Sequence, residues 1–100
     1  MATLLFEIWE DHEVGSVFEM SLVSRQHDEM RKSLTSNAIL LHTFRASSDF
    51  EAPRIYHEFM GWGPWKPEPS WLESHFTNEQ AREQEAYLLG RHSTGGREKP

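Results

Sequence analysis

Cysteine and long hydrophobic runs are both missing from this sequence. Without cysteine the chain can form no disulfide, no thiolate zinc site and no cysteine nucleophile, and a reducing compartment is its simpler setting. Its apolar runs, such as Ala38 to Leu41, are far shorter than the roughly 20 residues of a membrane-spanning helix. Glu7 also interrupts the apolar stretch near the N-terminus, where a signal peptide would be uncharged. We therefore expect a cytoplasmic protein with no membrane partner.

Basic residues are scarce as well. The chain has 10 lysines and arginines against 16 aspartates and glutamates, a formal net charge of −6 at pH 7. Proteins that bind nucleic acids concentrate lysine and arginine against the phosphate backbone, whereas Lys32 and Lys66 are the only lysines before the last residues of this chain. The composition therefore predicts no nucleic-acid partner. It favours a basic protein partner, or a surface whose charge serves only solubility.

Sequence motifs for catalysis and cofactor binding are also absent. There is no G-x-S-x-G elbow, no phosphate-binding loop and no dinucleotide fingerprint, and Gly61 stands where a zinc-protease helix would repeat His57. We accordingly predict no cofactor, no metal and no catalytic residue. One enzymatic alternative stays open, in which His42, His57 and Glu58 come together in a small hydrolase or a metal-dependent enzyme.

Alternating apolar and polar residues predict three β-strands. Residues 3–10 and 17–23 alternate with a period of two, and the polar segment 11–16 between them suits a hairpin loop. A third strand is predicted over 38–46. Strict alternation there would place Ile39 and Leu41 on one side, and Leu40 and Phe44 on the other.

Capping residues mark three helices. Ser24 can cap a helix that runs to Leu34, and Ser48 with Glu51 has the spacing of a capping box for a second helix that ends at Gly61. Pro53 would break the interior of that helix, so we place it in the first turn. A third helix over 78–89 is predicted to start at the capping box formed by Thr77 and Gln80 and to stop at Gly90.

This order predicts a single α+β domain. A core over 1–61 would hold a three-stranded antiparallel sheet in ββαβα order, with strand order 2-1-3 and the helices across one face. A Trp/Pro-rich arm (62–76), a C-terminal helix (77–90) and a disordered tail (91–100) would follow. The other face of the sheet would need the arm, the last helix or a second subunit to cover it. Its apolar residues are Leu5, Trp9, Val17, Ile39 and Leu41.

The arm is the most unusual feature of the chain. Three of the four tryptophans fall within residues 62–71, where glycines and prolines forbid an ordinary helix or central strand. Such rings either complete the core of the domain or form a recognition surface of the residue types that dominate binding hot spots. The predicted binding residues are Tyr56, Phe59, Trp62, Trp65 and Trp71.

Taken together, these patterns predict a non-enzymatic domain that acts through protein–protein contacts. The arm would supply the contact surface, and a homodimer is the first form expected, because the edges of a small sheet can pair with a second copy. The hydrolase alternative would use the arm as a lid over its site. A third possibility is an acidic mimic that occupies a basic groove on a partner protein.

Overall fold

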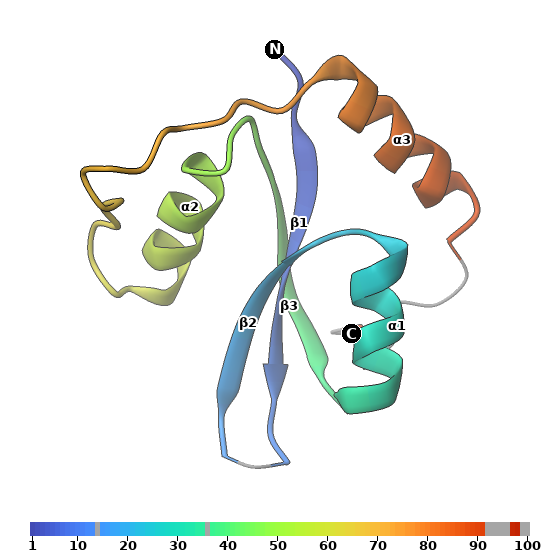
Figure 1. Ribbon diagram of the computed structural model, residues 1–100. Helices are drawn as coiled ribbons and strands as arrows, with labels where there is room; N and C mark the ends of the chain where they lie inside the picture. The colour runs from blue at the N-terminus through green and yellow to red at the C-terminus, as the bar shows by residue number, and fades with distance from the viewer. Residues whose placement is uncertain (14, 36, 92–96, 99–100) are drawn as a thin grey trace.

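The computed structural model describes residues 1–13, 15–35, 37–91 and 97–98. It confirms the predicted α+β class. Figure 1 shows the helices arranged around the sheet. The elements, in chain order, are β1 (Leu4–Asp11), β2 (Val17–Leu22), α1 (Arg25–Leu34), β3 (Ile39–Ala46), α2 (Glu51–Met60), α3 (Asn78–Leu89) and β4 (Arg97–Glu98).

The sheet has the predicted strand order around a central β1. β1 pairs antiparallel with β2 on one side and with β3 on the other, which brings Leu22 and Phe44 to either side of Phe6. The two residues of β4 extend the order to β2-β1-β3-β4 by pairing parallel with Ile39 and Leu40. The three long strands therefore follow from the alternation of the sequence, and β4 is an addition to the prediction.

A β-bulge changes the phase of β3. His42 is the partner of Ile8, but Leu40 rather than Leu41 is the partner of Trp9, so β3 carries one extra residue at this point. A bulge exchanges the two faces for all residues beyond it. The prediction that Leu40 and Phe44 share a side is therefore wrong, because Phe44 pairs with Phe6 and Leu40 with Trp9.

The helix ends follow the capping residues closely. The Ser24 Oγ accepts a hydrogen bond from the His27 N–H at 3.2 Å, and Thr77 with Gln80 forms a complete capping box. α2 begins late enough to leave Pro53 in its first turn and ends at Gly61, whose φ of 73° is left-handed. These predictions are confirmed because a cap depends only on residues close together in the sequence. The predicted capping box of Ser48 and Glu51 needs correction: Phe50 is the N-cap of α2 and makes no side-chain cap bond, although the Ser48 Oγ accepts from the Glu51 N–H at 3.0 Å.

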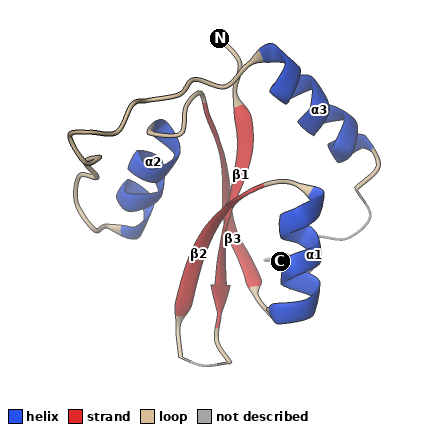
Figure 2. Ribbon diagram, in the orientation of Figure 1, coloured by secondary structure: helices blue, strands red, loops and turns tan. Residues whose placement is uncertain are grey.

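The helices lie on both faces of the sheet, rather than across one face as the sequence suggested. Figure 2 shows α2 on one side of the strands, with α1 and α3 on the other. α2 packs Ile55 against the cluster that contains Phe6. α1 covers the opposite face of β1, where the Arg31 guanidinium lies 4.1 Å from the centroid of the Trp9 ring. Trp9 is thus fully buried by α1 and not by the arm.

A buried ionic cluster joins α1, β1 and the end of α3. Its carboxylates are Glu7 and Asp28, which are 2% exposed each. The Arg91 guanidinium donates to both of them, at 2.9 Å to Glu7 Oε1 and 2.8 Å to Asp28 Oδ1. Asp28 also accepts hydrogen bonds from Arg31 at 3.2 Å and from the Tyr87 hydroxyl. This cluster takes the place that an apolar core would occupy on this face.

The start of the predicted tail needs correction. Arg91 was expected to begin a disordered segment, but its side chain is held by two buried carboxylates. Further on, Arg97 and Glu98 pair with β3. Residues 92–96 and 99–100, to which the rest of that prediction refers, lie outside the described residues.

α3 is attached to the sheet mainly through polar contacts. The Gln84 side chain is buried, and its amide accepts from the Leu5 N–H at 2.8 Å and donates to the Leu5 and Val23 carbonyl oxygens at 2.9 and 3.1 Å. Ala81 adds an apolar contact to the core cluster. Across the described ranges, none of the helices has the length and apolar character needed to cross a membrane.

Candidate functional site

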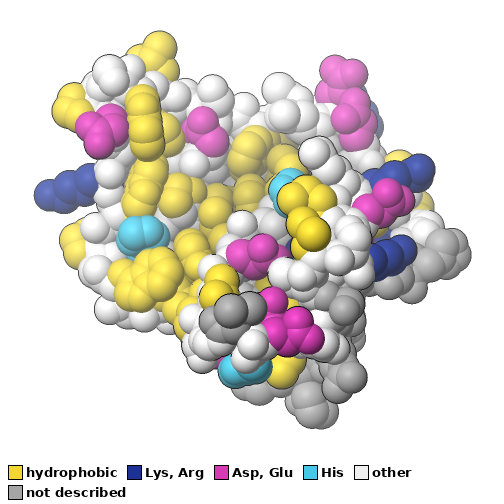
Figure 3. All heavy atoms as spheres, turned by 60° about the horizontal axis from the view of Figure 1, so that its bottom comes forward, with side chains coloured by type: hydrophobic (Ala, Val, Ile, Leu, Met, Phe, Trp, Pro, Cys, Tyr) yellow, Lys and Arg dark blue, Asp and Glu magenta, His cyan; other side chains and the backbone are white. Residues whose placement is uncertain are grey.

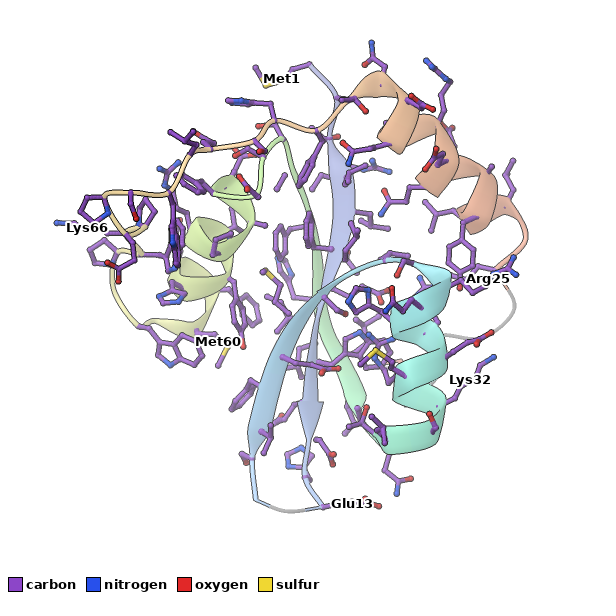
Figure 4. The ribbon with its side chains drawn as sticks, in the orientation of Figure 1. Met1, Glu13, Arg25, Lys32, Met60 and Lys66 are labelled. Carbon is purple, nitrogen blue, oxygen red and sulfur yellow. The ribbon has the colours of Figure 1, made fainter. Side chains whose placement is uncertain are left out.

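The five predicted binding residues are exposed or half-buried, and they lie on two sides of α2. The arm leaves the helix after Met60, and Figure 4 shows Lys66 on the side of α2 away from the sheet. Trp62 stays at the C-terminal end of the helix with Tyr56, whereas Trp65 turns back along the outer side. The arm therefore forms two separate aromatic groups. The tryptophan that completes the core is Trp9 instead.

The first group, which we call the inner aromatic surface, consists of His42, Tyr56, His57, Phe59 and Trp62. Phe59 stacks on His42 with ring centroids 4.7 Å apart. Trp62 meets Tyr56 and His57 edge-on at 5.3 and 5.2 Å. Phe59 and Trp62 are nevertheless 44% and 55% exposed. The rings hold one another in place while leaving much of their surface open.

This surface continues onto the sheet. Phe18 and Met20 of β2 lie on the same face as Ile8, and both stay only partly buried because α2 covers the other end of that face. Figure 3 shows hydrophobic side chains gathered along a hollowed centre between α2 and the hairpin of β1 and β2. Glu10 is the cross-strand partner of Phe18, and its carboxylate lies 3.2 Å from His12 Nε2. Phe18 and Met20 thus extend the inner aromatic surface as an apolar strip.

The second group, which we call the outer aromatic hollow, is a cavity of about 360 Å³. Its lining residues are Asp49, Phe50, Trp65, Trp71 and Leu72. Phe50 and Trp65 meet at nearly a right angle, with centroids 5.6 Å apart and an interplanar angle of 68°. Trp71 is 55% exposed at the rim. Three aromatic rings and one carboxylate therefore surround an open space.

Backbone hydrogen bonds fix the far end of the arm beside the start of α2. The Asp49 N–H donates to the Ser74 carbonyl at 3.1 Å, and the Ser74 N–H donates to Asp49 Oδ1 at 2.8 Å. Two residues on, the Phe76 N–H donates to the Ser47 carbonyl at 2.9 Å. The arm is thus tied at both ends, although its tip carries no helix or strand.

The tyrosine of the inner surface has a shifted pKa. Burial raises the pKa of the Tyr56 hydroxyl, and the negative charge of Glu19 raises it further. Tyr56 therefore remains neutral at any physiological pH. It contributes a ring and a hydroxyl donor to this surface rather than a charge.

The residues of the hydrolase alternative are engaged elsewhere. His42 stacks on Phe59, and His57 meets Trp62 edge-on. Among the residues that the structure describes, no group of three or more histidines, aspartates or glutamates is arranged to hold a metal ion.

Ser48, Glu73 and His75 are a second place to look for chemistry. The Ser48 hydroxyl donates directly to Glu73 and accepts from the Glu51 N–H at 3.0 Å, while His75 lies 4.0 Å from Glu73. A nucleophilic serine needs a base that takes its proton and an exposed oxygen. Ser48 is 1% exposed, and its oxygen already accepts from the N–H of Glu51, the first residue of α2, so its role is structural.

Sequence reasoning missed several members of both groups. His42 and His57 were considered only as ligands or bases, and Asp49 and Phe50 only as part of a helix start. The signal available in the sequence was the run of aromatic residues from 50 to 71. That run does not say which rings share a side of α2, because the path of a Gly/Pro-rich arm depends on long-range contacts.

Comparison with known proteins adds no relative to this picture. No family model, no curated protein and no solved structure matches the chain.

Proposed function

We propose that this protein is a non-enzymatic cytoplasmic domain that acts through protein–protein contacts, and that it forms a homodimer through the inner aromatic surface. The observation that supports this is a group of ordered but half-exposed rings, with Phe59 at 44% and Trp62 at 55% exposure. Large exposed apolar groups of this kind mark interaction sites on soluble proteins. Tryptophan and tyrosine also supply much of the binding energy in known interfaces.

The charge of the protein favours a second copy, rather than a basic partner, as the molecule that binds the inner aromatic surface. The chain carries a net charge of −6, so two copies repel each other wherever their carboxylates meet. The inner aromatic surface itself is made of aromatic rings and imidazoles rather than carboxylates, so packing two copies of it together does not bring its own residues into charge repulsion. A basic foreign partner would find few carboxylates there. Two neutral apolar strips can instead pack against each other about a two-fold axis.

The exposed rings provide enough apolar area to contribute substantially to the free energy of dimer formation. Covering the open half of a tryptophan removes roughly 100 Å² from water, worth about 2 to 3 kcal/mol at about 25 cal/mol/Å². Phe59, Phe18 and Met20 would add to this. Association must also offset at least about 4 kcal/mol of lost translational and rotational freedom. Several rings per copy are therefore needed, and the strip provides them.

The test is the mass of the protein in solution, by size-exclusion chromatography with light scattering over a range of micromolar concentrations. We expect twice the 11.7 kDa of the chain for the unchanged protein, and the monomer mass for Trp62→Ala. Trp71→Ala is a matched control, because both tryptophans are 55% exposed but Trp71 lies in the outer aromatic hollow. A monomer at every concentration, or equal loss in both variants, would refute the proposed interface.

A further inference from the structure

The outer aromatic hollow has a composition different from the inner aromatic surface. Its walls are Phe50, Trp65 and Trp71, and Asp49 supplies a carboxylate. A cation placed over the face of an aromatic ring is attracted by the negative charge of the π-cloud, most strongly over tryptophan. Rings at a large mutual angle let one cation meet several faces at once, and Phe50 and Trp65 are inclined by 68°. The hollow thus has the features of an aromatic cage.

The carboxylate of the hollow is held in place. Asp49 Oδ1 accepts a hydrogen bond from the Ser74 backbone N–H at 2.8 Å, and Asp49 itself is exposed. A carboxylate fixed beside aromatic faces supports a cation in two ways, through the rings and through its own charge. Because the arm already fixes the position of Asp49, ligand binding does not have to order this carboxylate.

The electrostatic balance around the hollow also favours a cation. The N-terminus of α2 is near and carries a partial positive charge of about +0.5, but three carboxylates surround it. Asp49 is the first. Glu51 accepts from the Ser47 N–H at 2.6 Å, and Glu73 accepts from the Ser48 hydroxyl. Arg54 lines a different cavity on the other side of Trp65. These carboxylates outweigh the partial positive charge of the helix end.

We propose that the outer aromatic hollow binds a quaternary ammonium group. A methylated ammonium carries its charge under an apolar shell, so it loses little hydration when it enters a cage of rings. Ordinary lysine is more strongly hydrated and fits such a cage less well. The cavity of about 360 Å³ has room for a trimethylammonium group with part of the chain that carries it. This site lies apart from the proposed dimer surface and does not depend on it.

The experiment is a titration followed by NMR of the tryptophan indole N–H signals. Choline is the first probe, and 3,3-dimethyl-1-butanol is the neutral control, since it has the same shape without the charge. We expect choline to shift the signals of Trp65 and Trp71 but not that of Trp62. The neutral analogue should bind at least about tenfold more weakly. Equal binding of the two compounds, or no shift up to about 100 mM choline, would overturn the proposal.

Variants separate the cage from a general effect on the fold. Asp49→Asn removes the charge but keeps an oxygen for the Ser74 N–H, and we expect choline affinity to fall severalfold. Trp71→Leu keeps an apolar side chain at an exposed position and should weaken binding about tenfold. Trp62→Leu is the control and should bind choline normally. Unchanged affinity in the first two variants, with indole signals as dispersed as in the unchanged protein, would also overturn the proposal.

The source of the ammonium group can be distinguished with the same assay. Phosphocholine and a short peptide with one trimethyllysine present the same group on different carriers. Tighter binding of the peptide than of its unmodified lysine form would assign the hollow to a modified protein tail. Tighter binding of phosphocholine would assign it to a small molecule or a lipid headgroup. Either result supports quaternary ammonium binding, whereas equal affinity for the unmodified peptide contradicts it.

Discussion

The two faces of the sheet use opposite chemistry. On the α1 side, charged residues are buried, and Glu7, Asp28 and Arg31 are each 2% exposed. On the α2 side, aromatic residues such as Phe59 and Trp62 are half exposed. Proteins usually bury apolar side chains and expose charges. Here the α1 face encloses charges together with Trp9, whereas the α2 face buries the Phe6 cluster but leaves the rings beyond it open for contact.

This difference separates stability from recognition. A buried ion pair contributes little net stability compared with apolar residues of the same size, but removing one partner is costly because the other charge is left unpaired. An exposed ring contributes little to folding and much to association. We therefore expect substitutions on the α1 face to change unfolding and those on the α2 face to change binding.

The largest effect should come from Asp28→Ala. This change removes the acceptor of Arg31, Arg91 and Tyr87 together and should lower the free energy of unfolding by about 3 to 5 kcal/mol. Urea denaturation measures it. Glu19→Ala is the control, since Glu19 lies 3.6 Å from Arg31 but is 48% exposed, and it should cost at most about 1 kcal/mol. A similar loss of unfolding free energy in both variants would show that the buried carboxylate is no more important than the exposed one.

The pH dependence of stability should report the contacts of Asp28 with Arg91, Arg31 and Tyr87. Burial alone would raise the pKa of Asp28, but hydrogen bonds from Arg91 and Tyr87 and the charges of both arginines hold it below its usual value. The ionised carboxylate therefore stabilises the fold above about pH 4, and this contribution is lost as pH falls through the lowered pKa. Asp28→Asn should flatten that acid decline. If the loss of unfolding free energy at low pH, measured by urea titrations, is unchanged in Asp28→Asn, other groups control this loss.

A corresponding loss is expected at high pH. Burial, and then the hydrogen bond to Asp28 and its negative charge, raise the pKa of the Tyr87 hydroxyl. The neutral phenol therefore stabilises the fold below about pH 10, and its contribution disappears as pH rises through the raised pKa. Tyr87→Phe should remove the Tyr87 part of this alkaline decline and leave the part that comes from Tyr56, whose pKa is also raised. The absorbance of tyrosinate, followed in the unchanged protein and the variant, identifies the titrating group.

A smaller effect is expected from exchanging tryptophan for phenylalanine on each face. Trp9→Phe deletes a fully buried indole whose N–H donates to Glu7 at 3.2 Å, and should lower stability by about 1 to 3 kcal/mol. Trp62→Phe should change stability by at most about 0.5 kcal/mol but weaken the dimer. Thermal unfolding and light scattering distinguish the two results. Equal destabilisation would place Trp62 in the core.

Replacing Gln84 should have a modest effect on stability that is local to α3. Gln84→Ala removes three hydrogen bonds to backbone groups of Leu5 and Val23 and should cost about 1 to 2 kcal/mol. Because α3 has few apolar contacts, its amides should exchange with solvent faster while those of β1 and β3 stay protected. Hydrogen exchange measures both. Uniformly faster exchange would mean that α3 and the sheet unfold as one unit.

The parts of the fold that sequence could predict are those with short-range causes. The hairpin follows from alternation on either side of a polar loop, and α3 follows from Thr77 and Gln80 three residues apart. The ionic cluster could not be predicted, because Arg91 is 63 residues from Asp28 and 84 from Glu7. The bulge at Leu41 also escaped prediction, since strict alternation cannot show where a strand gains a residue.

The candidate site was predicted in composition but not in arrangement. Tyr56, Phe59 and Trp62 do form one group, because a helical turn and a left-handed Gly61 bring them together. Trp65 and Trp71 belong to another group, since hydrogen bonds between Ser74 and Asp49 pull the arm to the outer side of α2. Spacing in the sequence gives no information about such a distant attachment.

The contact between Glu7 and Arg91 has a consequence for synthesis of the chain. A ribosome makes β1 long before it makes Arg91, the residue that neutralises Glu7. Until Arg91 emerges, the guanidinium that pairs with both Glu7 and Asp28 is missing, and burying an unpaired carboxylate is costly. The nascent hairpin and α1 can form early from local contacts, but this face cannot close until translation has passed residue 91. Closure of this face is thereby coupled to synthesis of a residue that follows Glu7 by 84 positions.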